Sequence, residues 1–178
     1  MLSYAEEDRA TMEKIRNRLR RESITVWTNT TDIKTGEEFS AAIKRGIEQA
    51  DNLVYLLSPD SVNSTYCQQE LDLALSYNKR IIPILVRDTS EKQVPEELQN
   101  LQYIDFTDNL NQVDSFIDES KLLKILHEDA AYYNEHKILL TKALKWVSQK
   151  NNPSILLRGY NLRSAQTWLE VAQKRRQH

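Results

Sequence analysis

The segment from residue 53 to residue 78 constrains the fold more than any other part of the chain, because it reads as a strand, a turn and a helix in one run. Leu53–Leu57 is a continuous apolar run, which is typical of a parallel strand buried on both faces. Pro59 and the polar residues after it end the strand. Thr65, with Gln68 three residues later, forms a capping-box pattern, so the sequence predicts a helix that starts there.

Two side chains of this predicted helix, Tyr66 and Glu70, are four residues apart and so lie on one helical face. They follow the carboxyl end of a predicted central strand, where open α/β sheets bind their ligands. An aromatic ring beside a carboxylate can hold a flat heterocycle and stabilise a sugar cation. The other interpretation is a solvated glutamate beside a partly buried tyrosine, and these two residues taken alone favour it.

Strand and helix patterns alternate through the first two thirds of the chain. Apolar runs predict further strands, and amphipathic patterns predict helices between them; the strands are expected at Met1–Tyr4, Ile24–Trp27, Ile81–Val86 and Tyr103–Phe106. Pro83 is unusual in a strand because it cannot donate to a ladder, so we expect it at a bulge or facing an unpaired side. Five strands alternating with helices predict an α/β fold with a parallel, doubly wound sheet.

Strand patterns stop after Asp108, and the rest of the chain is predicted to be helical. One long helix is expected from about Glu119 to Gln149, because two apolar stripes recur there every seven residues: Leu126, Tyr133, Leu140 and Val147, and Ile125, Tyr132, Leu139 and Trp146. We therefore divide the chain into a sheet domain, 1–118, and an α-helical extension, 119–178. The plain interpretation of the extension is a helical hairpin packed on the sheet domain or on a second copy. It ends without a stop signal, so we expect it to link to a further module.

Composition excludes several classes of protein. The 178 residues are 40% hydrophobic and 28% charged, which suits one domain with an appendage and not a disordered chain. The net charge is −6 over residues 1–110 (13 Lys+Arg against 19 Asp+Glu) and +4 over residues 111–178 (11 against 7), so neither part argues for nucleic acid. No apolar run is long enough to span a membrane. The single cysteine, Cys67, fits a reducing cytosol, and we expect a cytoplasmic protein.

The motifs of several enzyme classes are missing from the sequence. There is no Gly-x-Gly-x-x-Gly and no phosphate-binding Gly-Lys-Ser/Thr loop. The three histidines, His127, His136 and His178, have no ligand partners at metal spacing, so no metal site is expected. Cys67 lies on an apolar stripe with Leu71 and is predicted to belong to the core rather than to act as a nucleophile. A response-regulator receiver is excluded, since the third strand ends in Leu57-Ser58 where the acceptor aspartate would stand.

Five groups of motifs occur in order along residues 1–118. They are Leu2-Ser3-Tyr4 followed by Asp8; Ile24-Thr25-Val26-Trp27 followed by Asp32-Ile33-Lys34-Thr35-Gly36-Glu37-Glu38-Phe39; Leu56-Leu57-Ser58-Pro59; Ser64-x-x-Cys67-x-x-Glu70-Leu71; and Ile82-Pro83-Ile84. Together they resemble the Toll/interleukin-1 receptor (TIR) domain. The extension is similar to the one that joins bacterial TIR domains to further modules. The resemblance implies a flavodoxin-like, five-stranded parallel sheet with helices on both faces. The chain departs from the family in two places. Most members begin the first strand several residues earlier, so this strand is truncated or has an unusual start, and Thr28-Asn29 stands where an aspartate is common.

The resemblance also implies an activity. In TIR domains that cleave NAD⁺, the helix glutamate at the position of Glu70 is catalytic, which makes the chain an NAD⁺ nucleosidase of bacterial immune or stress signalling. NAD⁺ is then the substrate, and no cofactor is implied. The residues expected to line the substrate pocket are Ser3, Tyr4, Trp27, Phe39, Ser58 and Tyr66; residues such as Trp27 and Phe39 more often belong to the core.

Self-association is the last implication. In the family, the loop that corresponds to Asp32–Phe39 reaches a neighbouring domain, so Asp32, Lys34 and Gly36 are expected to mediate assembly into a homo-oligomer or filament. The alternative is a non-catalytic adaptor that acts only through TIR–TIR contacts. A nucleic-acid-cleaving or cyclic-nucleotide activity is a third possibility. The sequence leaves the product of NAD⁺ cleavage open.

Overall fold

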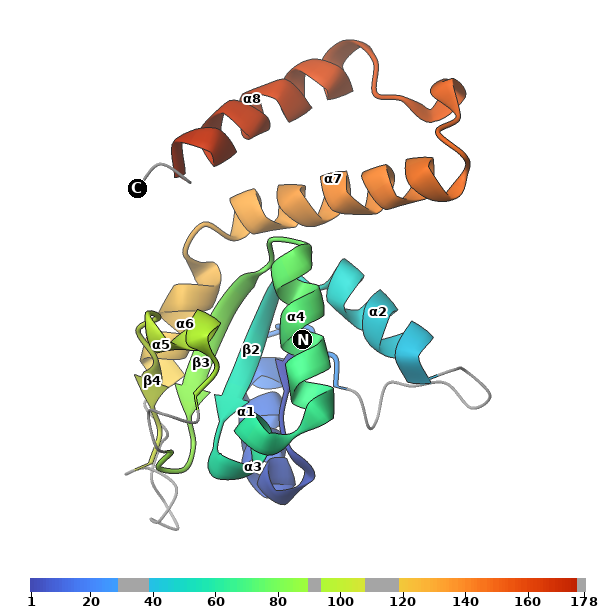
Figure 1. Cartoon of the computed structure of the whole chain (residues 1–178). Coiled ribbons are helices and arrows are strands. Elements are labelled where there is room, and N and C mark those ends of the chain that lie inside the picture. The colour runs from blue at the N-terminus through green and yellow to red at the C-terminus, as the bar shows by residue number, and fades with distance from the viewer. Residues whose placement is uncertain (29–38, 90–93, 108–118, 176–178) are drawn as a thin grey trace. The chain divides into compact units, whose positions relative to one another are not determined.

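The computed structural model describes residues 1–28, 39–89, 94–107 and 119–175 (Figure 1). The chain forms two compact units, Met1–Glu128 and Asp129–His178. The first unit contains the sheet and is followed by a second unit of helices only. The boundary lies after helix α6 (Glu119–His127), whereas the sequence-based division was placed before it.

The first unit is built on a parallel sheet. Its strands are β1 (Leu2–Ser3), β2 (Asn52–Leu57), β3 (Arg80–Leu85) and β4 (Ile104–Asp105), in the order β1-β2-β3-β4. This confirms the predicted parallel sheet with helices on both faces, followed by a helical extension. The sheet has four strands among the described residues, because Ile24–Trp27 forms no strand of its own.

The fifth predicted strand is represented only by a single β-bridge to β1. Thr28 pairs in parallel with Leu2, and the Leu2 N–H donates to the Trp27 carbonyl at 2.9 Å. Because β1 is only two residues long, it offers too few backbone partners for a longer ladder. The bridge still places this segment outside β1, which is the strand order of a flavodoxin-like sheet.

Pro83 lies in the middle of β3, opposite Tyr55 of β2. The Val86 N–H donates to Leu57 of β2, while the Leu85 carbonyl accepts from Phe106 after β4. Since backbone groups alternate between sides along a strand, the nitrogen of Pro83 faces the β4 side. Pairing with β4 begins only at Ile84, so the proline removes no ladder hydrogen bond, as the sequence led us to expect.

The two faces of the sheet carry different helices. Alternate residues of β2 and β3 pack against α1 (Arg9–Arg21), which follows the short 3₁₀ helix η1 (Glu6–Asp8), and against α6; this cluster includes Val54, Leu56, Ile82, Ile84 and Leu122. The other residues pack against α2 (Phe39–Gln49), α4 (Thr65–Ser76) and α5 (Glu96–Gln99) in a second cluster that includes Leu53, Tyr55, Leu57, Leu71 and Leu98. We call these the α1 face and the α4 face.

The turn between β2 and α4 is itself helical. Ser58 and Ser61 form a capping box around a five-residue helix, α3 (Pro59–Asn63). Ser64 then caps α4 by accepting from the Cys67 N–H at 3.3 Å. The predicted Thr65–Gln68 capping box is therefore wrong by one residue: Ser64 is the N-cap, and the Gln68 N–H donates to the Ser64 carbonyl at 3.0 Å instead of to the Thr65 hydroxyl.

Two consecutive basic residues at the start of β3, Lys79 and Arg80, cap the C-terminal ends of two helices on opposite faces of the sheet. The Lys79 ammonium donates to the carbonyls of Glu48 and Ala50, at 3.0 and 2.7 Å, at the end of α2. The Arg80 guanidinium donates to the carbonyls of Ile125 and Glu128, at 2.9 and 3.0 Å, at the end of α6. Both contacts place positive charge where a helix leaves its carbonyls unpaired.

The second unit is a helical hairpin of α7 (Ala130–Ser148) and α8 (Gly159–Arg175), with a short 3₁₀ helix, η3 (Pro153–Ile155), between them. The predicted single helix from 119 to 149 is wrong. Asp129 has a left-handed backbone (φ 58°) that separates α6 from α7. The apolar stripes continue across this break, so periodicity alone did not reveal it.

Candidate functional site

Helix α4 presents one buried face to the sheet, formed by Cys67, Glu70, Leu71 and Ala74. Glu70 has 0% of its surface exposed, whereas Tyr66, one turn earlier, is 56% exposed. The interpretation of a solvated glutamate beside a partly buried tyrosine is therefore wrong for both residues. A carboxylate within an otherwise apolar helix face is unusual, because burial disfavours a charged group.

The Ser3 hydroxyl lies on the same face of the sheet. Ser3 is fully buried in β1 and pairs in register with Tyr55 of β2. Its hydroxyl oxygen has no hydrogen-bond partner of normal geometry among the residues that the structure describes. The Cys67 thiol, whose pKa this hydroxyl lowers slightly, is at most a weak partner. A buried hydroxyl in this state is available to a ligand.

The carboxylate of Glu70 helps to raise the pKa of two neighbouring groups, a thiol and a phenol. Burial, together with the Glu70 charge, raises the pKa of the Cys67 thiol to about 11. Burial, followed by the charges of Cys67 and Glu70, also raises the pKa of the Tyr55 phenol well above its ordinary value. Both groups are thus neutral near pH 7. This agrees with the expectation that Cys67 belongs to the core and is no nucleophile.

A network of charged groups closes the carboxyl edge of the sheet. The buried Asp8 accepts from the Ser58 hydroxyl at 2.5 Å and from Nε of Arg87 at 2.7 Å. Arg87 also donates to Asp60. The hydrogen bond to Asp8, more than the one to Asp60, raises the pKa of Arg87. Ser58, predicted to line the pocket, is therefore held in this network.

The sequence did not assign Arg87 to the site. Its position directly after the apolar run Ile81–Val86, at the carboxyl end of a strand, is the signal that points to it. Asp8 belonged to the first group of sequence motifs, but no role in the site was predicted for it. The structure brings these two residues together across 79 positions of sequence, which no local pattern predicts.

The family model described as "TIR domain" matches residues 1–123, more than two thirds of the chain. The chain belongs to the TIR domain family.

One solved structure agrees with this assignment, and a second shows a weaker similarity. The TIR domain of the Toll-related receptor TRR-2 from the lower metazoan Hydra magnipapillata is 28% identical in sequence, with a TM-score of 0.58; the match covers 72% of this chain and 94% of that one. The TIR domains of the activated Roq1 resistosome, which directly recognises the pathogen effector XopQ, are 23% identical with a TM-score of 0.47, covering 78% and 80%. None of the curated proteins compared with the chain matches it.

The structure describes two more of the predicted pocket residues of the TIR domain, Tyr4 and Trp27. Tyr4 is buried in the cluster of the α1 face, opposite Ser3. Trp27 packs with the α4-face cluster, and its ring lies against Gly46 of α2, where an added Cβ would approach it to 2.7 Å. Its placement is that of a core residue. The side chain of Phe39, and all of Asp32, Lys34 and Gly36, lie outside the described residues.

Among the described residues, no group of three or more His, Cys, Asp or Glu side chains is arranged to hold a metal ion. No helix in the same part of the chain has the length and apolar character needed to cross a membrane.

Proposed function

We propose that this TIR domain is an NAD⁺ nucleosidase that cleaves the bond between nicotinamide and ribose, with Glu70 as its catalytic residue. The observation that carries the proposal is the fully buried carboxylate of Glu70 on α4, on the same side of the sheet as the buried Ser3 hydroxyl. Carboxylates held in such surroundings occur chiefly where a reaction needs them, since burial is costly for a residue that only packs.

The chemistry needs one carboxylate. Nicotinamide in NAD⁺ is already a cationic leaving group, so it departs as a neutral molecule without a general acid. The barrier lies in the positive charge that develops on the ribose as the bond breaks. A carboxylate positioned beside the ribose stabilises that charge directly or by accepting hydrogen bonds from the ribose hydroxyls, which contributes about 10²–10³-fold to the rate.

Binding of the substrate is assigned to the surroundings of Glu70. The ring of Tyr66 is 56% exposed and would stack on a base, and the Ser3 hydroxyl would donate to a ribose or amide oxygen. Ser58 lies in the Asp8–Arg87 network and would shape the pocket rather than react. For Phe39 the proposal rests on the family resemblance alone. Tyr4 and Trp27 are better explained by packing.

Access to Glu70 suggests how the activity is controlled. Glu70 has no exposed surface in the single chain, so a substrate reaches it only after a rearrangement. We propose that self-association supplies this rearrangement, with the loop that holds Asp32, Lys34 and Gly36 contacting a neighbouring TIR domain. A higher local concentration of TIR domains would then switch on cleavage. We place the activity in bacterial immune or stress signalling in the cytoplasm.

The same burial favours a second candidate function. A carboxylate with no exposed surface contacts no substrate in this conformation, which is compatible with a non-catalytic adaptor that acts only by TIR–TIR contacts. In that case the fold would keep Glu70 for structural reasons.

One experiment separates the two functions. NAD⁺ is incubated with the full chain over a roughly hundredfold range of protein concentration, and the products are resolved by chromatography. Glu70→Gln should lower turnover by about 10²–10³-fold while circular dichroism shows a folded protein. Asp72→Asn is the matched control, because Asp72 is an exposed carboxylate two residues along the same helix. Wild-type protein that is inert at every concentration, or a folded Glu70→Gln variant with wild-type turnover, rejects the nucleosidase.

A further inference from the structure

The second unit has almost no core of its own. No residue of α7 is buried, and Ala172 is the one buried residue of α8. A column of rings joins the two helices: Trp168 stacks on Tyr132 and His136 with centroid distances of 5.1 and 5.5 Å, and its indole N–H donates to the Tyr132 carbonyl at 3.1 Å. Arg175 adds an exposed ion pair with Asp129 and lies over the Tyr132 ring. Helices gain most of their stability from burying an apolar face, so this hairpin needs a further surface to pack on.

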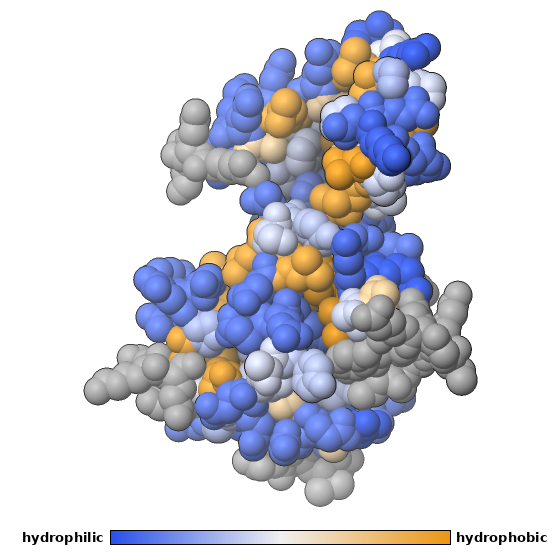
Figure 2. Space-filling model, turned by 45° about the vertical axis from the view of Figure 1, so that its right-hand side comes forward, coloured by the Kyte–Doolittle hydropathy of each residue, from blue (hydrophilic) through white to orange (hydrophobic). Residues whose placement is uncertain are grey.

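Apolar side chains are concentrated on the outside of this unit. Six of the nine large hydrophobic residues exposed in the described chain belong to it: Val147, Leu156, Tyr160, Leu162, Leu169 and Val171. Figure 2 shows this hydrophobic surface interspersed with hydrophilic residues. Scattered apolar residues are ordinary on a protein surface, but this density on two helices marks a contact surface.

One flank of the hairpin forms a groove. Its volume is about 510 Å³, and its lining includes Tyr132, Tyr160, Arg163, Trp168 and Val171. Tyr160 is 77% exposed and so presents its ring to whatever enters. The guanidinium of Arg163 forms no ion pair with any other described residue. An exposed aromatic residue beside an unpaired arginine is typical of the residues that dominate protein interfaces.

The charge of the hairpin specifies the chemistry of its partner. Residues 129–178 carry 9 Lys+Arg against 3 Asp+Glu, a net charge of +6, whereas residues 1–128 carry 15 against 23, a net charge of −8. Two hairpins would repel each other, so a bundle of two hairpins is disfavoured. The partner surface must be acidic at its rim and apolar at its centre.

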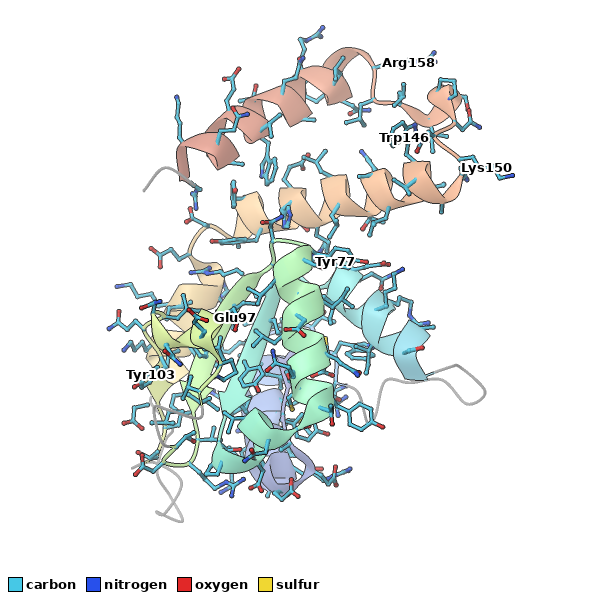
Figure 3. The ribbon with its side chains drawn as sticks, viewed as in Figure 1. Tyr77, Glu97, Tyr103, Trp146, Lys150 and Arg158 are labelled. Carbon is cyan, nitrogen blue, oxygen red and sulfur yellow. The ribbon has the colours of Figure 1, made fainter. Side chains whose placement is uncertain are left out.

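The first unit offers such a surface at the β4 edge of its sheet. Residues 95–107 hold Glu96, Glu97 and Asp105 and no lysine or arginine. Within this segment Leu101 and Tyr103 are exposed large hydrophobic residues. Figure 3 shows Glu97 on α5 and Tyr103 just before β4 at this edge. We call residues 95–107 the acidic edge.

We propose that the α7–α8 groove of one copy docks on the acidic edge of a second copy, with Arg163 facing Glu97. This contact joins two different surfaces, so successive copies add head to tail into open chains. It involves residues other than Glu70 and other than the loop that holds Gly36, and it does not depend on the proposed activity.

The test exchanges the charges of the two surfaces. Self-association of the full chain is measured by sedimentation velocity for wild type, Arg163→Glu, Glu97→Lys and the double variant. Each single change should weaken association about tenfold, and the double variant should restore it. A mixture of the two single variants should also associate, because the altered groove of one meets the altered edge of the other. Tyr160→Ser should weaken association without lowering thermal stability.

Lys150→Glu is the control for net charge, since Lys150 lies in the turn after α7 and points outward (Figure 3). It should leave association unchanged. A double variant that recovers while the mixture does not would place the contact within one copy and overturn the proposal. Stronger association of Arg163→Glu would indicate hairpin–hairpin contact and also overturn it. A wild type that is monomeric throughout, or singles that behave as wild type, would reject it outright.

Discussion

The two faces of the sheet bury different kinds of side chain. The α1 face is closed by aliphatic and aromatic residues such as Met12, Leu56 and Phe106, with Tyr4 at one end. The α4 face has an apolar cluster of its own, but it also buries the carboxylate of Glu70 and the thiol of Cys67. The hydroxyl of Ser3 belongs to this face as well, since it acts on the Cys67 thiol.

Under the proposed function, this difference separates stability from function within one domain. Apolar burial at about 25 cal/mol per Å² is the main term that favours folding, and the buried cluster of the α1 face contributes it with the Tyr4 hydroxyl as its one polar side-chain group. Burying Glu70 works against folding. A fold that retains such a group on one face, while keeping the other apolar, is consistent with a site on the α4 face.

The largest expected effect on stability is on the α1 face. Phe106 is fully buried there, and its N–H donates to the Leu85 carbonyl at 2.8 Å, a bond that alanine keeps. Phe106→Ala should therefore lower the free energy of unfolding by about 3–5 kcal/mol through the cavity it leaves. Urea denaturation measures this, and NAD⁺ turnover per folded molecule should not change. A variant that keeps its stability but loses turnover would reverse the roles of the two faces.

The α4 face should make the protein sensitive to alkali. The Cys67 thiol has a pKa of about 11 in the folded chain against an ordinary value of 9.0. The unfolded chain thus loses this proton at lower pH than the folded chain, so the stabilisation is complete below pH 9 and disappears between about pH 9 and 11. Each pKa unit corresponds to about 1.4 kcal/mol, which gives on the order of 2–3 kcal/mol.

Cys67→Ala provides the measurement. Urea denaturation at a series of pH values should show a shallower alkaline loss for this variant than for wild type. The raised pKa of Tyr55 acts in the same direction; the part caused by burial is present in both proteins, and the part caused by the Cys67 charge is lost together with the thiol. Identical pH profiles for the two proteins would mean that the thiol ionises as freely in the folded chain as in the unfolded one.

The sheet could be predicted from the sequence because the patterns that indicate its strands are short, continuous runs of residues. Leu53–Leu57 and Ile81–Val86 are apolar at every position, and such runs form buried parallel strands almost regardless of their surroundings. The position of Pro83 followed from the same reasoning. The break at Asp129 escaped it, because Ile125 and Tyr132 keep the seven-residue spacing on either side.

The candidate site was less predictable, since it depends on contacts between distant segments. A glutamate on a helix is exposed by default, and the burial of Glu70 arises from the packing of α4 on the sheet, which also buries Ser3 and Tyr55. Composition and periodicity contain no sign of this burial; the position of Glu70 after a central strand made it a candidate, and the family resemblance gave it a catalytic role. The Asp8–Arg87 pair likewise exists only after β1 and β3 are assembled into one sheet.

Disrupting the Asp8–Arg87 pair should have a smaller effect on the free energy of unfolding. Asp8→Asn removes the charge that accepts from Ser58 and Arg87, and hydrogen bonds to charged groups contribute about 1.5–3 kcal/mol. The free energy of unfolding should fall by that amount in urea denaturation. Glu6→Gln is the control, because Glu6 pairs with Arg9 in an exposed position and should leave the unfolding midpoint unchanged. Equal effects of the two changes would show that the network at the sheet edge is no stronger than a surface ion pair.

The smallest expected effects on stability concern Lys79 and Arg80, adjacent residues that cap helices on the two faces of the sheet. Lys79 is 5% exposed and closes α2 on the α4 face, whereas the partly exposed Arg80 closes α6 on the α1 face. A cation at a helix end contributes up to about 2 kcal/mol when partly buried and about 0.3–1 kcal/mol near the surface. Lys79→Met should therefore cost more than Arg80→Met in urea denaturation, and Lys14→Met, at an exposed position of α1, should cost nothing measurable. If Arg80→Met proves the more damaging change, the end of α6 depends on its capping cation more than the end of α2 does. The α1 face would then rely on a charged contact as much as the α4 face relies on its buried polar groups, and the contrast between the faces would be limited to Glu70 and its neighbours.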